Sequence, residues 1–264
     1  MKRILALIGI LVLAVAGVSW LYFSSLQNKT TGTTQIIRAL QPDALFAYSF
    51  YNEKEYSEIF RNNSLFVSVT GRDALNELQS LRNFVDQKST LKQAFNGMPV
   101  VISLHMDSVK KQTSWMISTS LPQAISWNDM LKIFTRYGKL KEQGTIYVLE
   151  VPQLGRPLFI SRKKSIIAVS FALETVNNFA QNTEENTFTQ LGDQQNRNSL
   201  AGLSVNYRLL PALRKMTSKN RSNLFFDLLP AVSGSSATTI TYNQTALLFN
   251  GVTYLDENDR GPVS

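Results

Sequence analysis

The feature that most constrains this chain is an uncharged, apolar run close to its amino terminus. The residues from Ile4 to Phe23 include no charged side chain, and Lys2 and Arg3 stand just before them. In an α-helix each residue adds about 1.5 Å, so a run of about twenty residues reaches about 30 Å, the thickness of a bilayer's hydrocarbon core. The run is apolar all round the helix, which argues against a half-buried core helix. Residues 4–23 are therefore predicted to span a membrane once.

The charges around this run predict its orientation. Lys2 and Arg3 are the only positive charges near its start, and the positive-inside rule keeps such an end in the cytoplasm. Trp20 and Tyr22 lie at the far end, where an aromatic belt is expected. We therefore expect a single-pass protein of the inner (cytoplasmic) membrane, with its amino terminus in the cytoplasm and its bulk, beyond Leu26, outside it.

A cleaved signal peptide is the alternative reading of the same segment. Ala14-Val15-Ala16 fits the small-x-small cleavage rule after the apolar stretch 4–13. Apolar residues continue past that site at Val18, Leu21 and Phe23, which favours an anchor that stays attached. In both cases the remainder of the chain is extracytoplasmic.

The amino-acid composition limits the kinds of functional site that the chain beyond the apolar run can form. Hydrophobic residues make up 44% and charged residues 17% of the 264 residues, enough apolar matter for a packed core. The chain has no cysteine, which excludes disulfides, thiolate metal sites, cysteine nucleophiles and a lipid-modified cysteine anchor. Its single histidine excludes most histidine-dependent catalysis.

Periodicity predicts a tether, 28–35, and two folded units, 36–181 and 201–264, joined by a polar loop, 182–200. In the first unit we expect strands at 44–51, 100–106, 113–120, 145–151, 157–162 and 165–171, and helices at 53–60, 74–85, 89–96, 127–137 and 173–180. Ser89 and Ser126 are the expected helix caps. In the second unit we expect a strand at 202–208, helical segments at 211–216 and 224–229, and a hairpin of 237–242 with 246–255.

The second unit repeats the order of strand, helices and hairpin found in the first. We infer a degenerate internal repeat, in which Leu203-Ser204-Val205 corresponds to Leu45-Phe46-Ala47. The second copy lacks the later three strands, so its final hairpin is expected to leave an unpaired sheet edge and to be a contact surface. The predicted fold class is α+β: an antiparallel sheet with helices on one face, following the transmembrane helix.

Three segments carry a family resemblance: Pro42-Asp43-Ala44-Leu45-Phe46, the strand from Pro99 to His105, and Ala246 to Gly251. They resemble a poorly characterised family of membrane-anchored extracytoplasmic envelope proteins from Bacteroidota. The resemblance covers most of the exported region and implies an envelope protein without an established activity. Members of that family typically continue beyond such a second hairpin, and this chain departs from that pattern.

No residue pattern predicts a catalytic, cofactor or metal site. A zinc site at His105 would need several carboxylates, and only Asp107 is near in sequence. A serine-histidine-acid triad would have to use the same histidine, and the chain has no Gly-x-Ser-x-Gly turn. Strand alternation places His105 opposite the apolar face, so we expect it to point to solvent or to a helix-sheet margin and to be dispensable. Ser-x-x-Lys pairs occur at chance frequency, at Ser89/Lys92, Ser108/Lys111 and Ser161/Lys164.

The basic excess is modest. Without Lys2 and Arg3, the 27 basic residues fall to 25 against 19 acidic residues, a net charge of +6. Short basic groups lie at 110–111, 162–164 and 208–221. They could bind anionic lipid headgroups or an acidic polymer, but we expect them to form an ordinary solvated surface. The compartment disfavours nucleic acid as a partner.

These observations favour a non-catalytic, membrane-anchored extracytoplasmic binding or scaffold protein of the bacterial envelope, with no cofactor. Its expected partners are the membrane, through residues 4–23, and another envelope protein. Two alternatives stay open: an extracytoplasmic hydrolase, and a carrier that holds an amphiphile between sheet and helices. The aromatic residues that fit a carrier fit a packed core equally well: Phe46, Phe50, Phe84, Trp115, Trp127 and Phe134.

The anchor is open to direct test. Amino-terminal sequencing of the protein isolated from membranes is expected to read from the start of the chain, because the apolar run continues past Ala16. A mature protein that begins at Gly17 would instead establish cleavage of a signal peptide.

Overall fold

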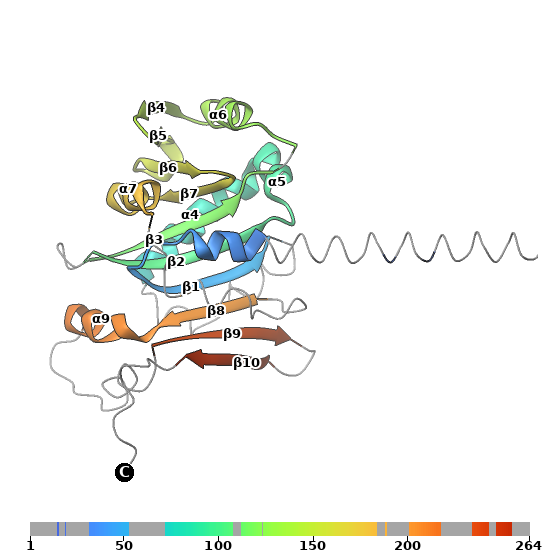
Figure 1. The fold of residues 1–264 in the computed structure, drawn as a ribbon. Coiled ribbons are helices and arrows are strands. Elements are labelled where there is room, and N and C mark those ends of the chain that lie inside the picture. Colours follow the sequence, from blue (N-terminus) through green and yellow to red (C-terminus); the bar gives the residue numbers. More distant parts are fainter. Residues whose placement is uncertain are drawn as a thin grey trace, which may run out of the picture.

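The computed structural model describes Val15, Ser19, residues 32–52, 72–107, 112–122, 124–183, 188, 201–217, 234–242 and 247–254. These residues form an α+β fold, with ten strands in one antiparallel sheet and helices packed against it (Figure 1). The strands are β1 (Ala44–Tyr51), β2 (Pro99–Asp107), β3 (Gln112–Ser120), β4 (Lys139–Gln143), β5 (Ile146–Glu150), β6 (Leu158–Lys163), β7 (Ile166–Ser170), β8 (Ala201–Asn206), β9 (Ser235–Tyr242) and β10 (Leu247–Tyr254). The helices are one at 32–38, α4 (Arg72–Gln87), α5 (Ser89–Phe95), α6 (Trp127–Thr135), α7 (Leu173–Gln181) and α9 (Leu210–Thr217), with 3-10 turns at Pro152–Leu154 and Tyr207–Leu209.

The strand order places the first strand near the middle of the sheet. It runs β10-β9-β8-β1-β2-β3-β7-β6-β5-β4, and each neighbouring pair is antiparallel. The strands β2 and β3 therefore extend from one side of β1, and β8, β9 and β10 extend from the other. Among the described strands, β4 and β10 are the two edges of the sheet.

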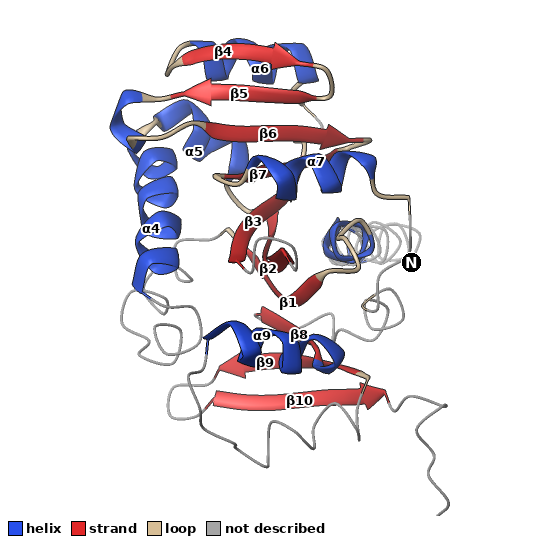
Figure 2. Ribbon diagram, turned by 90° about the vertical axis from the view of Figure 1, so that its left-hand side faces the viewer, coloured by secondary structure: helices blue, strands red, loops and turns tan. Residues whose placement is uncertain are grey.

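Helices cover both faces of this sheet, so the expectation of helices on one face is wrong. The helix at 32–38 and α7 bury Ile36 and Phe179 against one face, in a cluster with Val101 of β2. The helices α4, α5, α6 and α9 pack on the other face, where Leu104 of β2 lies. Figure 2 shows α4 and α7 on either side of β3. Successive residues of a strand point to opposite faces, and in β2 both sets are buried, so each face needs a cover.

The fold begins inside the segment predicted to be a tether. Thr33 is buried, and its hydroxyl donates to the Tyr51 hydroxyl at 3.2 Å. The side chains of Ile36 and Ile37 are wholly buried. The helix at 32–38 is thus part of the core, although the start of the first unit was expected at residue 36.

The predicted anchor lies outside the described residues apart from Val15 and Ser19, both of which are helical. In the part of the chain that the structure describes, no helix is long and apolar enough to cross a bilayer. The helices expected at 53–60 and 224–229 also lie outside the described residues.

Strand alternation and one of the two expected helix caps were predicted correctly. The hairpin of β2 and β3 and the helix cap at Ser126, whose hydroxyl accepts from the Asp129 N–H at 3.2 Å, are confirmed. Ser89 is not a cap, because α5 begins at Ser89 and Lys88 precedes it without a side-chain cap bond. The strand β4 was missed because its sequence, Lys-Leu-Lys-Glu-Gln, offers almost no apolar alternation.

The register between β1 and β8 shows how the two segments matched in the proposed repeat lie. Ala47 is the partner of Ser204, and Phe46 is the partner of Val205. Directly opposed residues share a face of the sheet, so Ala47 and Val205, which the proposed repeat equates, face opposite sides.

Gly138 provides a test of how closely the first unit is packed. A Cβ atom there would lie 2.3 Å from the carbonyl oxygen of Glu150, so Gly138→Ala forces backbone apart and is expected to cost about 3 kcal/mol. Gly144 is the matched control, because a Cβ there meets nothing within 4 Å and only its positive φ resists substitution, at about 1 kcal/mol. Urea denaturation of the full chain in detergent would measure both; equal midpoints for the two alanine variants would contradict the packing.

Candidate functional site

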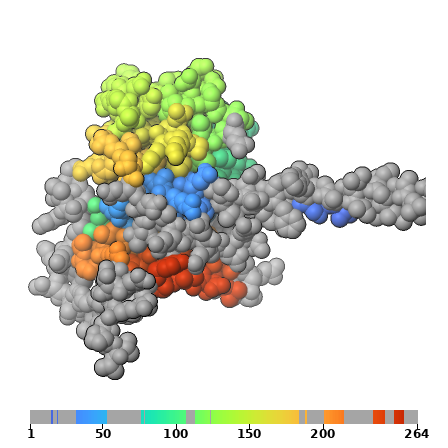
Figure 3. All heavy atoms as spheres, in the orientation of Figure 1, coloured from blue at the N-terminus to red at the C-terminus, as the bar shows by residue number. Residues whose placement is uncertain are grey.

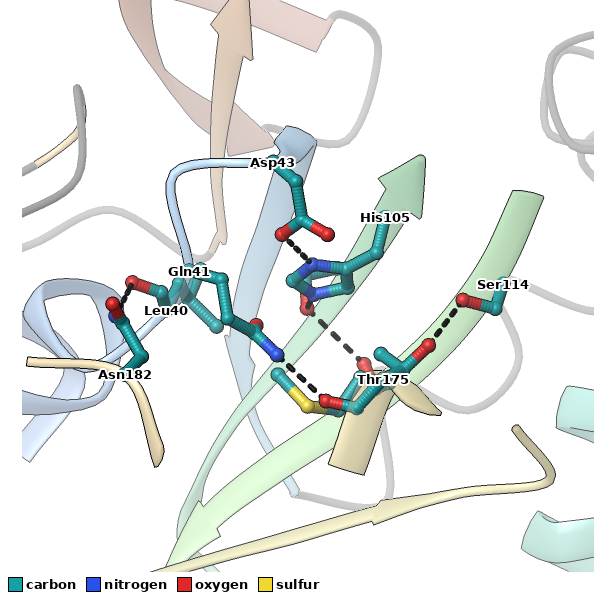
Figure 4. A network of polar contacts seen from close by, with 9 residues as sticks. Leu40, Gln41, Asp43, His105, Ser114, Thr175 and Asn182 are labelled. Atoms are coloured by element: carbon teal, nitrogen blue, oxygen red, sulfur yellow. Dashed lines mark hydrogen bonds and ion pairs between the residues drawn. The ribbon is translucent and has the colours of Figure 1, made fainter. Parts of the chain in front are cut away.

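The single histidine lies at the centre of a buried polar cluster. His105, on β2, is 1% exposed. Its Nδ1 lies 2.9 Å from Oδ1 of Asp43, and its Nε2 lies 2.7 Å from Oγ of Ser103 (Figure 4). Asp43 stands immediately before β1, and Ser103 is two residues before His105 on the same strand, so both hydroxyl and imidazole share one face.

The burial of His105 corrects the expectation that it points to solvent. Alternation did place it, with Val101 and Ser103, on the face opposite Leu104. That face is covered by the helix at 32–38 and by α7, as the cluster around Val101 shows. His105 is therefore an interior residue with a partner at each ring nitrogen, and the expectation that it is dispensable does not fit its position.

The cluster has the acid–histidine–serine order of groups found in nucleophilic triads, but its serine hydroxyl is out of reach of a substrate. In the tautomer whose Nδ1–H donates to Asp43, Nε2 can accept the Ser103 O–H, the arrangement in which an imidazole activates a serine. The Ser103 hydroxyl also lies 3.5 Å from the Met116 carbonyl, a second acceptor for the same proton. The Ser103 side chain is wholly buried within β2, whose neighbours β1 and β3 flank it. A nucleophile must touch the atom it attacks, and no substrate reaches Oγ in this conformation. The three groups therefore form a structural hydrogen-bonded chain.

A second set of polar contacts ties the loop before β1 to α7. The Gln41 side-chain amide donates to the Thr175 carbonyl at 2.7 Å, and the Thr175 hydroxyl lies 2.5 Å from that of Ser114 on β3. The Asn182 amide donates to the Leu40 carbonyl at 3.4 Å. Figure 4 shows these contacts beside the histidine. They fix the loop before β1, which ends at Asp43, the residue that orients His105.

The other residues considered from sequence take structural or surface roles. The Ser161 hydroxyl is buried and donates to the Thr145 carbonyl at 3.0 Å. Ser89 is the exposed first residue of α5, and Ser108 lies outside the described residues. Among the described residues, no group of three or more histidine and carboxylate side chains is placed to hold a metal.

Three ionisable groups outside the cluster have displaced pKa values. Hydrogen bonds from Ser126 and Lys132 lower the pKa of Asp129. The hydrogen bond from Lys141 lowers the pKa of Glu150. Both carboxylates are exposed partners of surface ion pairs.

The third group is Lys163, whose pKa is lowered first by burial and then by the charge of Lys164. Its ammonium donates to the Asn182 carbonyl. That bond adds a further link between β6 and the end of α7, so this lysine too has a structural role.

The open edge formed by β10 is the second candidate site. Leu248, Phe249 and Val252 are 55%, 63% and 42% exposed, although all three are large and apolar. Their strand is the last of the sheet in the part of the chain that the structure describes. In Figure 3 the red residues of β9 and β10 lie at one end of the molecule, and the green residues around α6 and β4 lie at the other.

The opposite edge is built differently. The strand β4 presents Lys139, Lys141 and Glu142, and its residues are exposed apart from the half-buried Leu140. Charged side chains on an edge discourage pairing with another strand, whereas a long uncharged edge invites it. Among the described residues, the sheet is thus protected at β4 and has no outer neighbour at β10, a contrast that sequence reasoning missed because it did not find β4.

No protein-family model and no curated protein matches this chain. Two solved structures are similar, crystal forms III and I of TP0453, each with 11% sequence identity and a TM-score of 0.41. The matches cover 86% and 84% of this chain and 80% and 79% of those chains. A similarity of this size carries no information on function.

The polar cluster leads to a stability prediction. His105→Ala leaves the buried Ser103 hydroxyl and the Asp43 carboxylate without their shared partner, and is expected to cost about 3 kcal/mol. Asp43→Asn keeps an acceptor oxygen and is expected to cost about 1 kcal/mol. Lys132→Ala, on an exposed helix surface, is the control, with a change within about 0.5 kcal/mol. Urea midpoints that are the same for His105→Ala and the control would show that the cluster stabilises nothing.

Proposed function

We propose that the chain is a non-catalytic, membrane-anchored extracytoplasmic binding or scaffold protein of a bacterial envelope. In this proposal residues 4–23 hold it in the cytoplasmic membrane, and the β10 edge takes up a strand from a partner chain. The observation that carries the proposal is the edge itself, where three large apolar side chains are exposed on a strand without an outer neighbour among the described residues. Relationship to the Bacteroidota envelope family is part of the same proposal.

Strand addition explains why such an edge is useful without a catalytic group. An added strand gains its affinity from main-chain hydrogen bonds and its specificity from alternate side chains. Phe249 points to one face of β10, and Leu248 and Val252 point to the other. A strand laid along β10 would therefore meet apolar groups on both of its faces.

The degenerate repeat belongs to this proposal and is supported by topology. The strand β1 is followed by helices and the hairpin β2–β3, and β8 is followed by α9 and the hairpin β9–β10. The two sets lie back to back across the antiparallel β1–β8 pair. On the first side the sheet continues from β3 into β7, and on the second no described strand continues from β10. The open edge is thus where the second copy lacks what the first copy has.

Two observations favour a binding protein over the alternatives. A hydrolase based on His105 would need access to Ser103, whose side chain is wholly buried. A carrier would need unfilled apolar space, but three of the aromatic residues that suggested one, Phe46, Trp115 and Phe84, each pack against another ring. The ring centroids are 5.5 Å apart for Phe46 and Trp115, and 5.9 Å apart for Phe84 and Tyr137.

The edge is tested by lysine substitutions at its exposed positions. Phe249→Lys and Val252→Lys place charge where a partner strand would lie, and are expected to reduce partner capture from detergent-solubilised membranes at least tenfold. Leu173→Lys is the matched control, because Leu173 is an equally apolar residue, 45% exposed, on α7 and away from the edge. Partners would be identified by quantitative mass spectrometry after affinity capture of the full chain. Edge variants that stay folded and retain every partner would exclude β10 as the interface.

A further inference from the structure

We propose that the occupant of the β10 edge is a second copy of this chain, whose β10 pairs antiparallel with the first about a two-fold axis at Asn250. The inference rests on the proposed function, because it names the partner of the same edge. It makes one continuous sheet from two chains. Three features of the chain support this pairing: the outward backbone groups of β10, the side-chain pattern about Asn250, and the charges of the two sheet edges.

The backbone of β10 offers hydrogen-bonding groups to an outer neighbour at alternate residues. The carbonyl of Asn250 accepts from the Thr239 hydroxyl at 2.9 Å, and that of Tyr254 accepts from the Gly234 N–H at 2.8 Å. The carbonyls of even-numbered residues are therefore directed towards β9. In a regular antiparallel strand the groups of alternate residues point the opposite way, so the N–H and C=O groups of Phe249 and Gly251 face outward.

An antiparallel copy centred on Asn250 uses these outward groups as pairs. Phe249 of one chain lies opposite Gly251 of the second copy, and Gly251 lies opposite Phe249 of the second copy. Both are positions at which the two chains exchange N–H and C=O bonds. Asn250 lies opposite Asn250 of the second copy in a non-hydrogen-bonded pair, in which the two Cα atoms are closer than in a hydrogen-bonded pair. There its side-chain amide can donate to and accept from the amide of the second copy.

The side chains are complementary in the same register. Leu248 lies opposite Val252 of the second copy, and the two-fold repeats that pair, so one exposed aliphatic pair lies on each side of the Asn250 pair on the same face. On the other face Phe249 lies opposite Gly251 of the second copy, so the ring meets no side chain of the residue that it opposes. The strand β10 thus carries both members of each cross-strand pair.

Gly251 is required at its position by packing within the chain. A Cβ atom there would lie 2.6 Å from the Ala237 carbonyl oxygen and 2.8 Å from the Thr238 hydroxyl, both on β9. Atoms of β9 therefore already occupy the side-chain direction of this glycine. Gly251 is two residues from Phe249, which is the spacing that a two-fold at Asn250 converts into direct opposition.

Charge favours a copy at this edge and at no other described edge. From 247 to 254 the sequence Leu-Leu-Phe-Asn-Gly-Val-Thr-Tyr has no charged residue, so two such strands do not repel each other. Two copies of β4 would bring together Lys139 and Lys141 in an exposed strand. A two-fold interface uses one surface patch twice, and only β10 is suited to meeting itself.

The absence of cysteine from the chain makes the register directly testable. In Asn250→Cys, the full chain in detergent carries one thiol that meets its own copy at a Cα separation of about 4.5 Å, within disulfide range. Mild oxidation is expected to convert more than half of the protein to a dimer on a non-reducing gel. Leu248→Cys is the control on the same strand, because its thiols would be about 13 Å apart along the strands. Mixed with Val252→Cys, it is expected to give the crosslinked heterodimer.

The outcomes separate this inference from the proposed function. Light scattering that gives a monomer for the unmodified chain in detergent, or crosslinking of Glu142→Cys on β4 as efficient as that of Asn250→Cys, would overturn the pairing. If the chain is monomeric and Phe249→Lys still loses another captured protein, the edge binds a different partner and only the present inference fails. If Phe249→Lys changes neither crosslinking of Asn250→Cys nor capture, both fail.

Discussion

The antiparallel pairing of β1 with β8 is the interaction on which the rest of this structure depends. It joins residues 46–50 to residues 201–205 and turns two groups of strands into one sheet. The residues facing the covered side at this pairing are small: Ala47 and Ser49 on β1, and Gly202 and Ser204 on β8. The Ser49 hydroxyl donates to the Gly202 carbonyl at 3.4 Å, a bond across the seam. Without this pairing, β8, β9 and β10 would form a sheet separate from the seven strands β1 to β7.

Apolar side chains are usually buried and polar side chains exposed. The polar interior and the apolar edge both depart from this distribution, with different consequences. Ser103 and His105 are buried polar groups, but each has a partner, so they specify how the loop at Asp43 meets β2. Leu248 and Phe249 are apolar groups left at the surface of an edge strand. A satisfied polar core favours a unique fold, whereas an exposed apolar edge favours an encounter with another chain. The candidate binding surface is therefore the second feature.

Much of the fold follows from local sequence, and the missing parts have physical reasons. Alternation along 100–106 and 113–120 was enough for the hairpin of β2 and β3, and the capping hydroxyl of Ser126 was enough for the start of α6. The environment of His105 was not predictable, because its partner Asp43 lies 62 residues away and serine and histidine on a strand read as a solvated face. The apolar exposure of β10 was not visible either, since an apolar strand is equally typical of a core. Only its place at the end of the strand order distinguishes the two.

The distance along the chain between β1 and β8 has a consequence for the order in which the protein is made. Ser49 and its partner Gly202 are 153 residues apart, whereas β1 and β2 are joined by a much shorter connection. As the chain emerges with its amino terminus first, β2 can cover one side of β1 early, but the other side has no native partner until β8 follows. During that interval β1 is itself an open edge. The nascent protein is therefore most exposed to wrong strand pairing, and most in need of a chaperone, before its last quarter has been synthesised.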